Sequence, residues 1–250
     1  MTDRRAVVVT GGSRGIGAAT CVALAGCGHD VCVGYATDLG AATAVARRCE
    51  EVGAAATVVQ ADVSDEADVI RLLDTASNEF GRLDGVVNNA AVVFPLGRVE
   101  DLDVTRIRRT FEVNVVGTML CAREAVRRMA TSRGGAGGVI VNVSSAAARL
   151  GSSNAYVEYA ASKAAVDTFT LGLAQEVIAD GIRVVGVRPG IVDTEIHAGS
   201  GGPGRLDELA ASTPIGRAAT AEEIADAIVW LLSDAASYVV GTTVDVTGGR

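Results

Sequence analysis

The sequence predicts a single α/β domain built on a doubly wound parallel sheet of about seven strands, with helices on both faces. Short runs of β-branched residues alternate with longer helical stretches over the whole chain of 250 residues. The strand-like runs are almost continuously apolar, as expected of strands buried on both faces of a parallel sheet. Neither a linker nor an internal repeat divides the chain, so we expect one domain over residues 1–250.

Each expected element follows from its local pattern. The strands are short apolar runs, in chain order Ala6–Val9, Val31–Tyr35, Ala56–Gln60, Gly85–Asn88, Val139–Val143, Arg183–Val187 and Thr243–Val246. The helices are the stretches between them, at about residues 15–26, 39–52, 65–79, 102–130, 155–179 and 221–233. Gly53, Gly81 and Gly181 stand where helices should end. Thr220 and Glu223 have the spacing of a capping box that opens the last helix.

Two glycine-rich segments predict loops. Residues 134–138 form the sequence Gly-Gly-Ala-Gly-Gly, which is typical of a surface loop. Residues 191–214 lack strong periodicity and follow the end of a strand. We expect this second segment to be a lid.

The composition excludes several classes of partner. The net charge is −8 and the pI is about 4.8, and no basic stripe suits nucleic acid. The five cysteines form no C-x-x-C pair, and no His/Cys cluster has zinc-ligand spacing, so we expect no metal and a reducing compartment. The N-terminus lacks a signal-peptide pattern, and no apolar run reaches the roughly 18 residues that span a bilayer. We therefore expect a cytoplasmic protein without nucleic-acid or membrane partners.

A glycine-rich turn joins the first expected strand to the first expected helix. Its sequence is Thr10-Gly-Gly-Ser-Arg-Gly-Ile-Gly17. Glycines allow a tight turn and the close approach of a pyrophosphate, and the helix N-terminus offers free N–H groups and the positive end of its dipole. The turn therefore predicts a dinucleotide site of the Rossmann type. The residues expected to bind there are Gly11, Ser13, Arg14, Gly15, Ile16 and Gly17.

The choice between NADP and NAD depends on the end of the second strand. An acid there would bind the ribose 2′-hydroxyl and favour NAD, but the strand tip itself carries none. Arg14 can pair with a 2′-phosphate and Thr37 can add a hydroxyl donor, which favours NADP. Asp38 opposes this prediction, because a strand end shifted by one residue would favour NAD.

Lys163 is the only lysine in the sequence, which otherwise uses arginine for its cationic positions. It stands four residues after Tyr159, and residues at i and i+4 share one face of a helix. A compact ammonium has a different reach from a planar guanidinium. The pair predicts an acid–base site in which nearby positive charge lowers the pKa of the phenol. Tyr156 has alanine four residues later, so we expect Tyr159 to be the reactive tyrosine.

Together with other motifs, these features resemble the short-chain dehydrogenase/reductase family over nearly the whole chain. The matching pieces are Thr10–Gly17, Asp62-Val63, Asn88–Ala91, Asn114, Ser144-Ser145, Tyr159–Lys163 and Pro189-Gly190. The pattern is most similar to glucose-dehydrogenase-like and ketoacyl-reductase-like members. The resemblance implies an NAD(P)-dependent oxidoreductase that transfers a hydride between the nicotinamide and a small alcohol or carbonyl. It also implies a homotetramer.

The resemblance gives each matching residue a role. Besides the glycine turn and Thr37, it implies a cofactor site made of Asp62, Val63, Asn88, Ala90, Tyr159, Lys163, Pro189, Gly190, Ile191 and Thr194. It implies a catalytic tetrad made of Asn114, Ser145, Tyr159 and Lys163. Ser145 is expected to stabilise charge on the substrate oxygen, and Asn114 to orient Lys163 through water. The spacing from Ser145 to Tyr159 is one residue longer than usual, which leaves Ser144 as an alternative and indicates an insertion within residues 151–157.

The substrate side is less sharply defined. Apart from the lid, its expected wall residues are Val93, Phe94, Leu150, Tyr156 and Glu158. A solvated helix carboxylate is the favoured interpretation of Glu158. His197 is expected to be an exposed loop residue and His29 to be structural. Trp230 is expected in the core or in a subunit interface, and the apolar tail Tyr238–Val246 in an interface.

Two other functions stay open at this point. One is a redox sensor that binds NADP without chemistry, although the intact Ser-Tyr-Lys-Asn set argues against it. The other is a sugar epimerase or dehydratase, whose chains are generally longer and have different glycine spacing. The substrate, which could be a sugar or polyol, a β-ketoacyl thioester or another ketone, is not decided by the fold.

Overall fold

A computed structural model describes residues 4–194 and 204–250, and its strands form one parallel sheet. The strand order is β3-β2-β1-β4-β5-β6-β7. The strands are β1 (Ala6–Val9), β2 (Asp30–Tyr35), β3 (Ala56–Gln60), β4 (Gly85–Asn88), β5 (Gly138–Val143), β6 (Ile182–Pro189) and β7 (Thr243–Val246). From β1, the chain adds β2 and β3 on one side of the sheet and then β4 to β7 on the other side, so the direction of winding reverses after β3. Such a reversal opens a crevice at the carboxyl ends of the strands. The predicted doubly wound sheet is confirmed.

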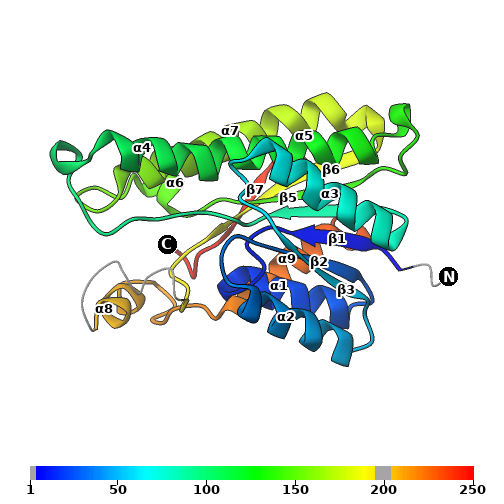
Figure 1. Ribbon diagram of the computed structural model, residues 1–250. Coiled ribbons are helices and arrows are strands. Elements are labelled where there is room, and N and C mark those ends of the chain that lie inside the picture. Colours follow the sequence, from blue (N-terminus) through cyan, green and yellow to red (C-terminus); the bar gives the residue numbers. More distant parts are fainter. Residues whose placement is uncertain (1–3, 195–203) are drawn as a thin grey trace.

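Helices cover both faces of this sheet (Figure 1). On one face lie α1 (Gly15–Gly26), α2 (Leu39–Glu51) and α9 (Ala221–Leu232). On the other face lie α3 (Glu66–Phe80), α5 (Thr118–Met129) and α7 (Val157–Val177). Strand β1 shows how the sequence makes two cores, because Val7 and Val9 belong to one buried cluster and Val8 to the other.

The stretch expected as one helix over residues 102–130 is divided. It consists of α4 (Val104–Phe111), a π-helical segment η2 (Glu112–Gly117) and α5. Asn114 lies in the π-helical segment, where it is fully buried. Apolar residues continue through this segment as Val113, Val115 and Val116, so an apolar pattern alone does not distinguish it from an α-helix. Such segments are frequent at functional sites.

Shorter elements complete the described chain. They are η1 (Val99–Asp101), η3 (Thr131–Arg133), α6 (Ala147–Leu150), η4 (Ile178–Asp180), α8 (Arg205–Ala211) and η6 (Asp234–Ala236). The capping box of α9 forms as predicted, with Thr220 and Glu223 each binding the other's backbone N–H. Gly81 ends α3 in the left-handed conformation, at φ 69°. The expected lid is described at 191–194 and 204–214, whereas its middle, with His197, lies outside the described residues.

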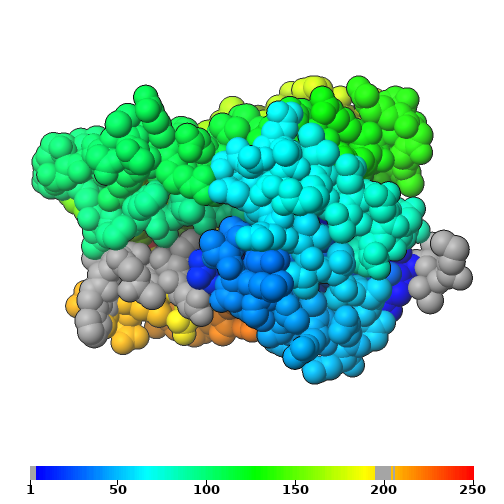
Figure 2. Space-filling model, in the orientation of Figure 1, coloured from blue at the N-terminus to red at the C-terminus, as the bar shows by residue number. Residues whose placement is uncertain are grey.

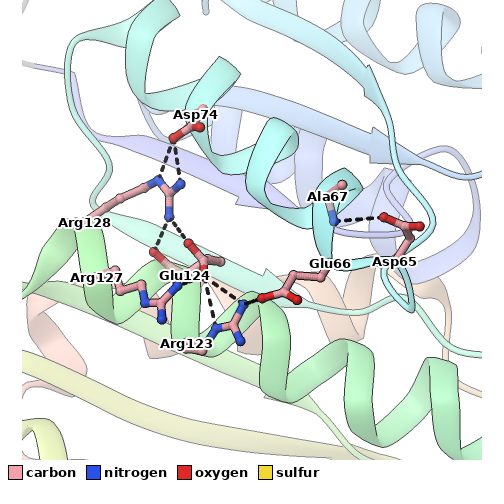
Figure 3. Close-up of polar contacts among 8 residues, drawn as sticks. All are labelled: Asp65, Glu66, Ala67, Asp74, Arg123, Glu124, Arg127 and Arg128. Atoms are coloured by element: carbon pink, nitrogen blue, oxygen red, sulfur yellow. Dashed lines mark hydrogen bonds and ion pairs between the residues drawn. The ribbon is translucent and has the colours of Figure 1, made fainter.

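An ionic network joins α3 to α5 (Figure 3). Glu124 on α5 is 3% exposed and accepts hydrogen bonds from Arg123, Arg127 and Arg128. Arg128 also bonds Asp74 on α3 at 2.6 Å. In Figure 1 the two helices lie in the layer above α1 and α2, and the space-filling view from the same side shows α3 above α2 (Figure 2). Within residues 4–194 and 204–250, no helix is long and apolar enough to cross a membrane.

Candidate active site

A cavity of about 550 Å³ opens at the carboxyl ends of β1, β2, β3 and β4. Among its lining residues are ten that the sequence predicts for a cofactor: Gly11, Ser13, Arg14, Gly15, Ile16, Thr37, Asp62, Val63, Ala90 and Thr194. Its other lining residues are Ala36, Asp38, Ala61, Asn89, Ala91, Val92, Val93, Arg109 and Val113. The cavity thus combines the glycine turn with the ends of three further strands.

The glycine turn depends on backbone shapes that other residues rarely adopt. Gly11 and Gly15 have φ values of +63° and +53°. Gly17 is constrained by space instead, because a Cβ atom there would lie 2.2 Å from the carbonyl oxygen of Gly11. Gly17 therefore packs against the backbone of the turn, while Gly11 and Gly15 line the cavity.

Asn89 holds the turn in place, and the sequence reasoning did not single it out. Its Nδ2 donates to the carbonyl oxygens of Thr10 and Gly11, at 2.9 and 3.0 Å. In return, the Thr10 hydroxyl oxygen accepts from the backbone N–H of Asn89 and of Ala90, both at 3.0 Å. The motif Asn88–Ala91 was a signal for this region, but only the fold distinguishes its first asparagine from its second.

The two neighbouring asparagines have different surroundings. Asn88 is 4% exposed and donates from Nδ2 to Oδ1 of Asn142 on β5, at 2.8 Å. It therefore bridges two strands beneath the cavity rather than lining it. Asn142 in turn donates to the hydroxyl of Thr170 on α7, so this buried chain ties β4, β5 and α7 together.

The groups that bear on NADP or NAD choice all line the cavity. Arg14 and Thr37 are exposed there, and Asp38 lies beside them. Asp38 caps α2, because its Oδ1 accepts from the backbone N–H of Ala41 at 2.8 Å. The carboxylate thus has a structural task at the start of α2 as well as a position at the cavity.

Asp62 and Val63 follow β3 and line the cavity next to Arg109 of α4. Arg109 donates to Oδ2 of Asp62 at 2.6 Å and to the Ser64 hydroxyl at 2.7 Å. Partial burial acts to raise the pKa of Asp62, but the hydrogen bonds from Ser64 and Arg109 outweigh it and lower this pKa. Arg109 was not predicted, since nothing local in the sequence connects it to Asp62.

The end of β6 and the residues that follow it lead to Thr194, which lies next to Gly15 of the glycine turn. Pro189 accepts a hydrogen bond from the Ala146 N–H at 2.9 Å, and Gly190 packs so closely on Thr247 that a Cβ would lie 2.8 Å from its Cα. Ile191 accepts from the Ala219 N–H at 2.9 Å. Thr194 reaches the cavity, where its Cγ2 would lie 3.4 Å from a Cβ on Gly15. Pro189, Gly190 and Ile191 support the cavity without lining it.

Tyr159 lies in the first turn of α7, and the side chain of Ser145, which follows β5, lies close enough to lower the pKa of its phenol. Ser144 lies differently, because its hydroxyl donates to the Lys163 carbonyl at 3.1 Å and the residue is 3% exposed. The geometry therefore brings Ser145 and not Ser144 to the phenol. In the chain between Ser145 and Tyr159, Ser152 and Asn154 have positive φ values of 49° and 58°. Both lie within residues 151–157, where the sequence indicated an insertion.

Lys163 is 3% exposed, and its Nζ donates to the Val143 carbonyl at 2.7 Å. Nζ lies 5.8 Å from the centroid of the Tyr159 ring. Burial lowers the pKa of Lys163 to about 8, against the opposing effect of the Asp167 carboxylate. Tyr159 and Lys163 thus share one face of α7, as their spacing predicted.

The pKa of Tyr159 shifts in the direction opposite to the one expected. Burial raises it to about 12, with a further increase from Tyr156, and the hydrogen bond from Ser145 only partly offsets this. Desolvation disfavours the charged phenolate, and this effect outweighs the stabilisation from Ser145. In this state the phenol holds its proton at neutral pH.

Asn114 connects the π-helical segment to two parts of the site. It exchanges hydrogen bonds with the backbone of Val92, at 2.8 Å through Oδ1 and 3.0 Å through Nδ2. Its Nδ2 also donates to the Ser162 hydroxyl at 3.0 Å. Asn114 therefore contacts the residue before Lys163, and its amide joins the loop after β4 to α7.

The residues expected around a substrate are only partly brought together. Val93 lines the cavity, and Tyr156 packs edge to face on Tyr159 with ring centroids 5.7 Å apart. Leu150 is 51% exposed at the end of α6. The favoured interpretation of Glu158 as a solvated carboxylate is wrong, because the residue is 5% exposed and is bound by Arg106. Phe94 lies against the same arginine.

Two further predictions concern residues away from the cavity. His29 is half-buried with a ring nitrogen 3.2 Å from the Leu24 carbonyl, and burial lowers its pKa, in agreement with a structural role. Trp230 is 43% exposed, which excludes the core as its place. Among the residues that the structure describes, no group of three or more His, Cys, Asp or Glu side chains could hold a metal ion.

The cavity suits a dinucleotide phosphate on chemical grounds. Glycine backbone, the N-terminus of the 12-residue helix α1 and the hydroxyl of Ser13 converge on one wall. Arg14 adds a positive charge to the lining of the same cavity. These donors fit anionic phosphate groups, and Lys163 of the tyrosine–lysine pair binds the last residue of β5.

Comparisons with known proteins agree with this geometry. Residues 11–250 match a family model described as enoyl-(acyl carrier protein) reductase. The chain is 51% identical over 243 residues to the uncharacterized oxidoreductase YgfF of Escherichia coli, covering 97% of this chain and 98% of that protein. It is 43% identical over 245 residues to cis-4-hydroxycyclohexanecarboxylate dehydrogenase of Sinomonas cyclohexanicum, covering 98% and 96%. A solved short-chain dehydrogenase from Burkholderia cenocepacia in complex with NADP has a TM-score of 0.89 and 33% identity, covering 98% of this chain and 97% of that one.

Proposed function

The chain belongs to the short-chain dehydrogenase/reductase family of oxidoreductases, and we propose that it transfers a hydride between NADP and a small secondary alcohol or the corresponding carbonyl. The observation that carries this proposal is the meeting of Ser145, Tyr159 and Lys163 at the carboxyl end of β5. A protein that only binds a dinucleotide needs the glycine turn but has no use for this second group of side chains. Bound NADP supplies or accepts the hydride.

In this mechanism Tyr159 exchanges the proton at the substrate oxygen. Reduction of a carbonyl requires a proton donor at the oxygen as negative charge develops there. The raised pKa of Tyr159, about 12, keeps its hydroxyl protonated and therefore suits this direction. Ser145, whose side chain lies beside the Tyr159 phenol, donates to the same oxygen and stabilises its charge.

Lys163 has two tasks in the proposal. Its ammonium, held on the Val143 carbonyl, adds positive charge beside the Tyr159 ring and stabilises the phenolate left after proton donation. We assign the binding of ribose hydroxyls of the cofactor to the same group. Asn114 keeps the helix that carries this lysine in register with the loop after β4.

We further propose NADP rather than NAD, on the basis of Arg14. Its exposed guanidinium lies at the cavity with the Thr37 hydroxyl, and the relative from Burkholderia cenocepacia was solved with NADP. The carboxylate of Asp38 is partly engaged in capping α2, which reduces its capacity to repel a 2′-phosphate.

We also propose a homotetramer. Apolar side chains are exposed along α4, η2 and α5: Val104, Ile107, Val116 and Met119. A second apolar region includes the exposed Trp230 and Tyr238 near the C-terminus. Exposed apolar surface of this kind is typical of subunit contacts. Light scattering coupled to size-exclusion chromatography would detect a monomer if this proposal is wrong.

A titration and a substrate panel test the proposed function. Purified protein is titrated with NADPH and NADH, and absorbance decay at the nicotinamide band is then followed with ketones, β-ketoacyl thioesters and sugars. The panel includes 4-oxocyclohexanecarboxylate, because a relative oxidises the corresponding alcohol. Turnover with one class and tighter binding of NADPH are expected. Tight cofactor binding without turnover on any class would contradict an oxidoreductase acting on these substrates.

A further inference from the structure

Arg106 and Glu158 form a buried ion pair that joins α4 to the first turn of α7. The Nε and Nη2 atoms of Arg106 lie 2.7 and 2.5 Å from Oε1 of Glu158. The side chains are 14% and 4% exposed. Both bonds use one carboxylate oxygen, and Oε2 is buried without a hydrogen-bond partner among the described residues. The orientation of the Glu158 carboxylate therefore depends on Arg106.

The same arginine supports the loop of residues 92–98, which follows β4 and is named the substrate loop below. The Arg106 guanidinium carbon lies 5.7 Å from the centroid of the Phe94 ring, in cation–π geometry. A Cβ on Gly97 would lie 3.2 Å from Nη1 of Arg106, so the loop backbone passes close over the guanidinium. One side chain thus touches the loop at two points while it holds Glu158.

Two backbone contacts place this loop beside the catalytic helix. The Gly97 N–H donates to the Ala155 carbonyl at 2.8 Å, just before α7 begins. Val92, at the other end of the loop, is bound to Asn114. Glu158 immediately precedes Tyr159. The ion pair therefore contacts both the loop and the turn that carries the phenol.

We infer that Arg106 and Glu158 are positioning residues that hold the substrate loop against the first turn of α7 and so set where a substrate lies relative to Tyr159. The inference rests on the proposed function. Buried ion pairs contribute little net stability compared with apolar packing, so the effect expected here is geometric. A small displacement of a bound substrate from its reactive geometry is costly for turnover.

The test uses Glu158→Gln in the full-length protein, with two comparison variants. Gln keeps the shape of the side chain but leaves the charge of Arg106 buried and unpaired. The double variant Arg106→Gln/Glu158→Gln removes both charges. Glu124→Gln is the matched control, because Glu124 is also 4% exposed at its side chain and bound by arginine, but it faces α3 (Figure 3). Hydrogen–deuterium exchange of residues 92–98 and the KM values for substrate and for NADPH are measured in the wild-type protein and in the three variants.

The expected result separates positioning from folding. In Glu158→Gln, exchange in the substrate loop increases and the KM for the carbonyl substrate rises by about tenfold, while the KM for NADPH stays within about twofold. The double variant recovers part of the loss, because no unpaired charge remains. Glu124→Gln lowers the melting temperature without changing exchange in residues 92–98 or the substrate KM.

Two outcomes would overturn the inference. Unchanged exchange of residues 92–98 in Glu158→Gln would show that the pair does not hold the loop. Increased exchange with an unchanged substrate KM would show that the loop position does not affect the substrate. If the wild-type protein turns over no substrate, the proposed function fails, and the exchange measurement still decides whether the pair holds the loop.

Discussion

Nζ of Lys163 donates a hydrogen bond to the carbonyl oxygen of Val143 at 2.7 Å, so the only lysine of the chain binds the last residue of β5. This contact directs the ammonium to the end of the sheet where Ser145 and Tyr159 meet. It also explains why the position suits lysine. The compact ammonium can donate to a single buried carbonyl beside a phenol ring, whereas the planar guanidinium of arginine is larger and has five donors to satisfy.

Replacing Tyr159 with phenylalanine should reduce kcat by about a thousandfold, because it removes the proposed proton donor and leaves the ring in place. Cofactor binding should change little, since Tyr159 does not line the cavity around the glycine turn. Tyr156→Phe is the control, as it keeps the edge-to-face contact with Tyr159. Steady-state kinetics and NADPH fluorescence titration measure the two effects. Loss of turnover in Tyr156→Phe with retention in Tyr159→Phe would reverse the assignment.

Lys163 should make stability depend on pH between about 8 and 10.5. Its pKa in the folded protein, about 8, lies below the value of 10.5 that an exposed lysine has. The unfolded chain therefore binds more protons in this window, and the free energy of unfolding rises with pH. Relative to Lys163→Met, the wild-type protein should gain about 3 kcal/mol across the window, since Lys163 is almost fully buried. Urea unfolding of both proteins at several pH values measures this difference. A difference that stays constant with pH would contradict the lowered pKa.

Arg14→Ala should weaken NADPH binding by about 10- to 100-fold, the range expected for a charged hydrogen bond. Binding of NADH should change little, because it lacks the 2′-phosphate. Asp38→Asn serves as the companion variant, since asparagine also caps helices and α2 should stay intact. It should improve NADPH binding slightly. Equal weakening of both cofactors in Arg14→Ala would mean that this arginine does not select between them.

Gly17→Ala should disrupt the glycine turn. The added Cβ would lie 2.2 Å from the Gly11 carbonyl oxygen and 2.6 Å from Asn89 Nδ2, and both atoms belong to the hydrogen-bonded core of the turn. Gly26→Ala, at the end of the same helix, meets no atom within 4 Å and should leave stability unchanged or slightly improved. Thermal unfolding and NADPH titration measure both. A Gly17→Ala protein with unaltered melting temperature and affinity would show that the turn adapts easily.

Much of the molecule could be predicted from the sequence because the signals are local. Buried parallel strands give continuous apolar runs, and each predicted run lies within a strand of the sheet. The capping box of Thr220 and Glu223 needs only a spacing of three residues. The shared face of Tyr159 and Lys163 needs only a spacing of four.

The sequence patterns failed where contacts join distant segments. Arg106 and Glu158 are 52 residues apart, and Arg109 and Asp62 are 47 apart, so no periodicity connects them. The π-helical turn at Asn114 was missed because its apolar pattern resembles that of a continuous helix. The direction of the Tyr159 pKa was wrong because the degree of burial is not visible in the sequence.

The sequence by itself determined the parallel sheet, the glycine turn and the tyrosine–lysine pair, since each depends on the conformational preferences of residues a few positions apart. Only the tertiary structure decided that Ser145 and not Ser144 meets the phenol, that Asn89 holds the turn, and that Glu158 is buried. Each of these outcomes depends on the direction in which a side chain points and on which other segments pack against that side chain. That is a property of the assembled layers, because desolvation and hydrogen-bond partners come from segments far apart in the chain.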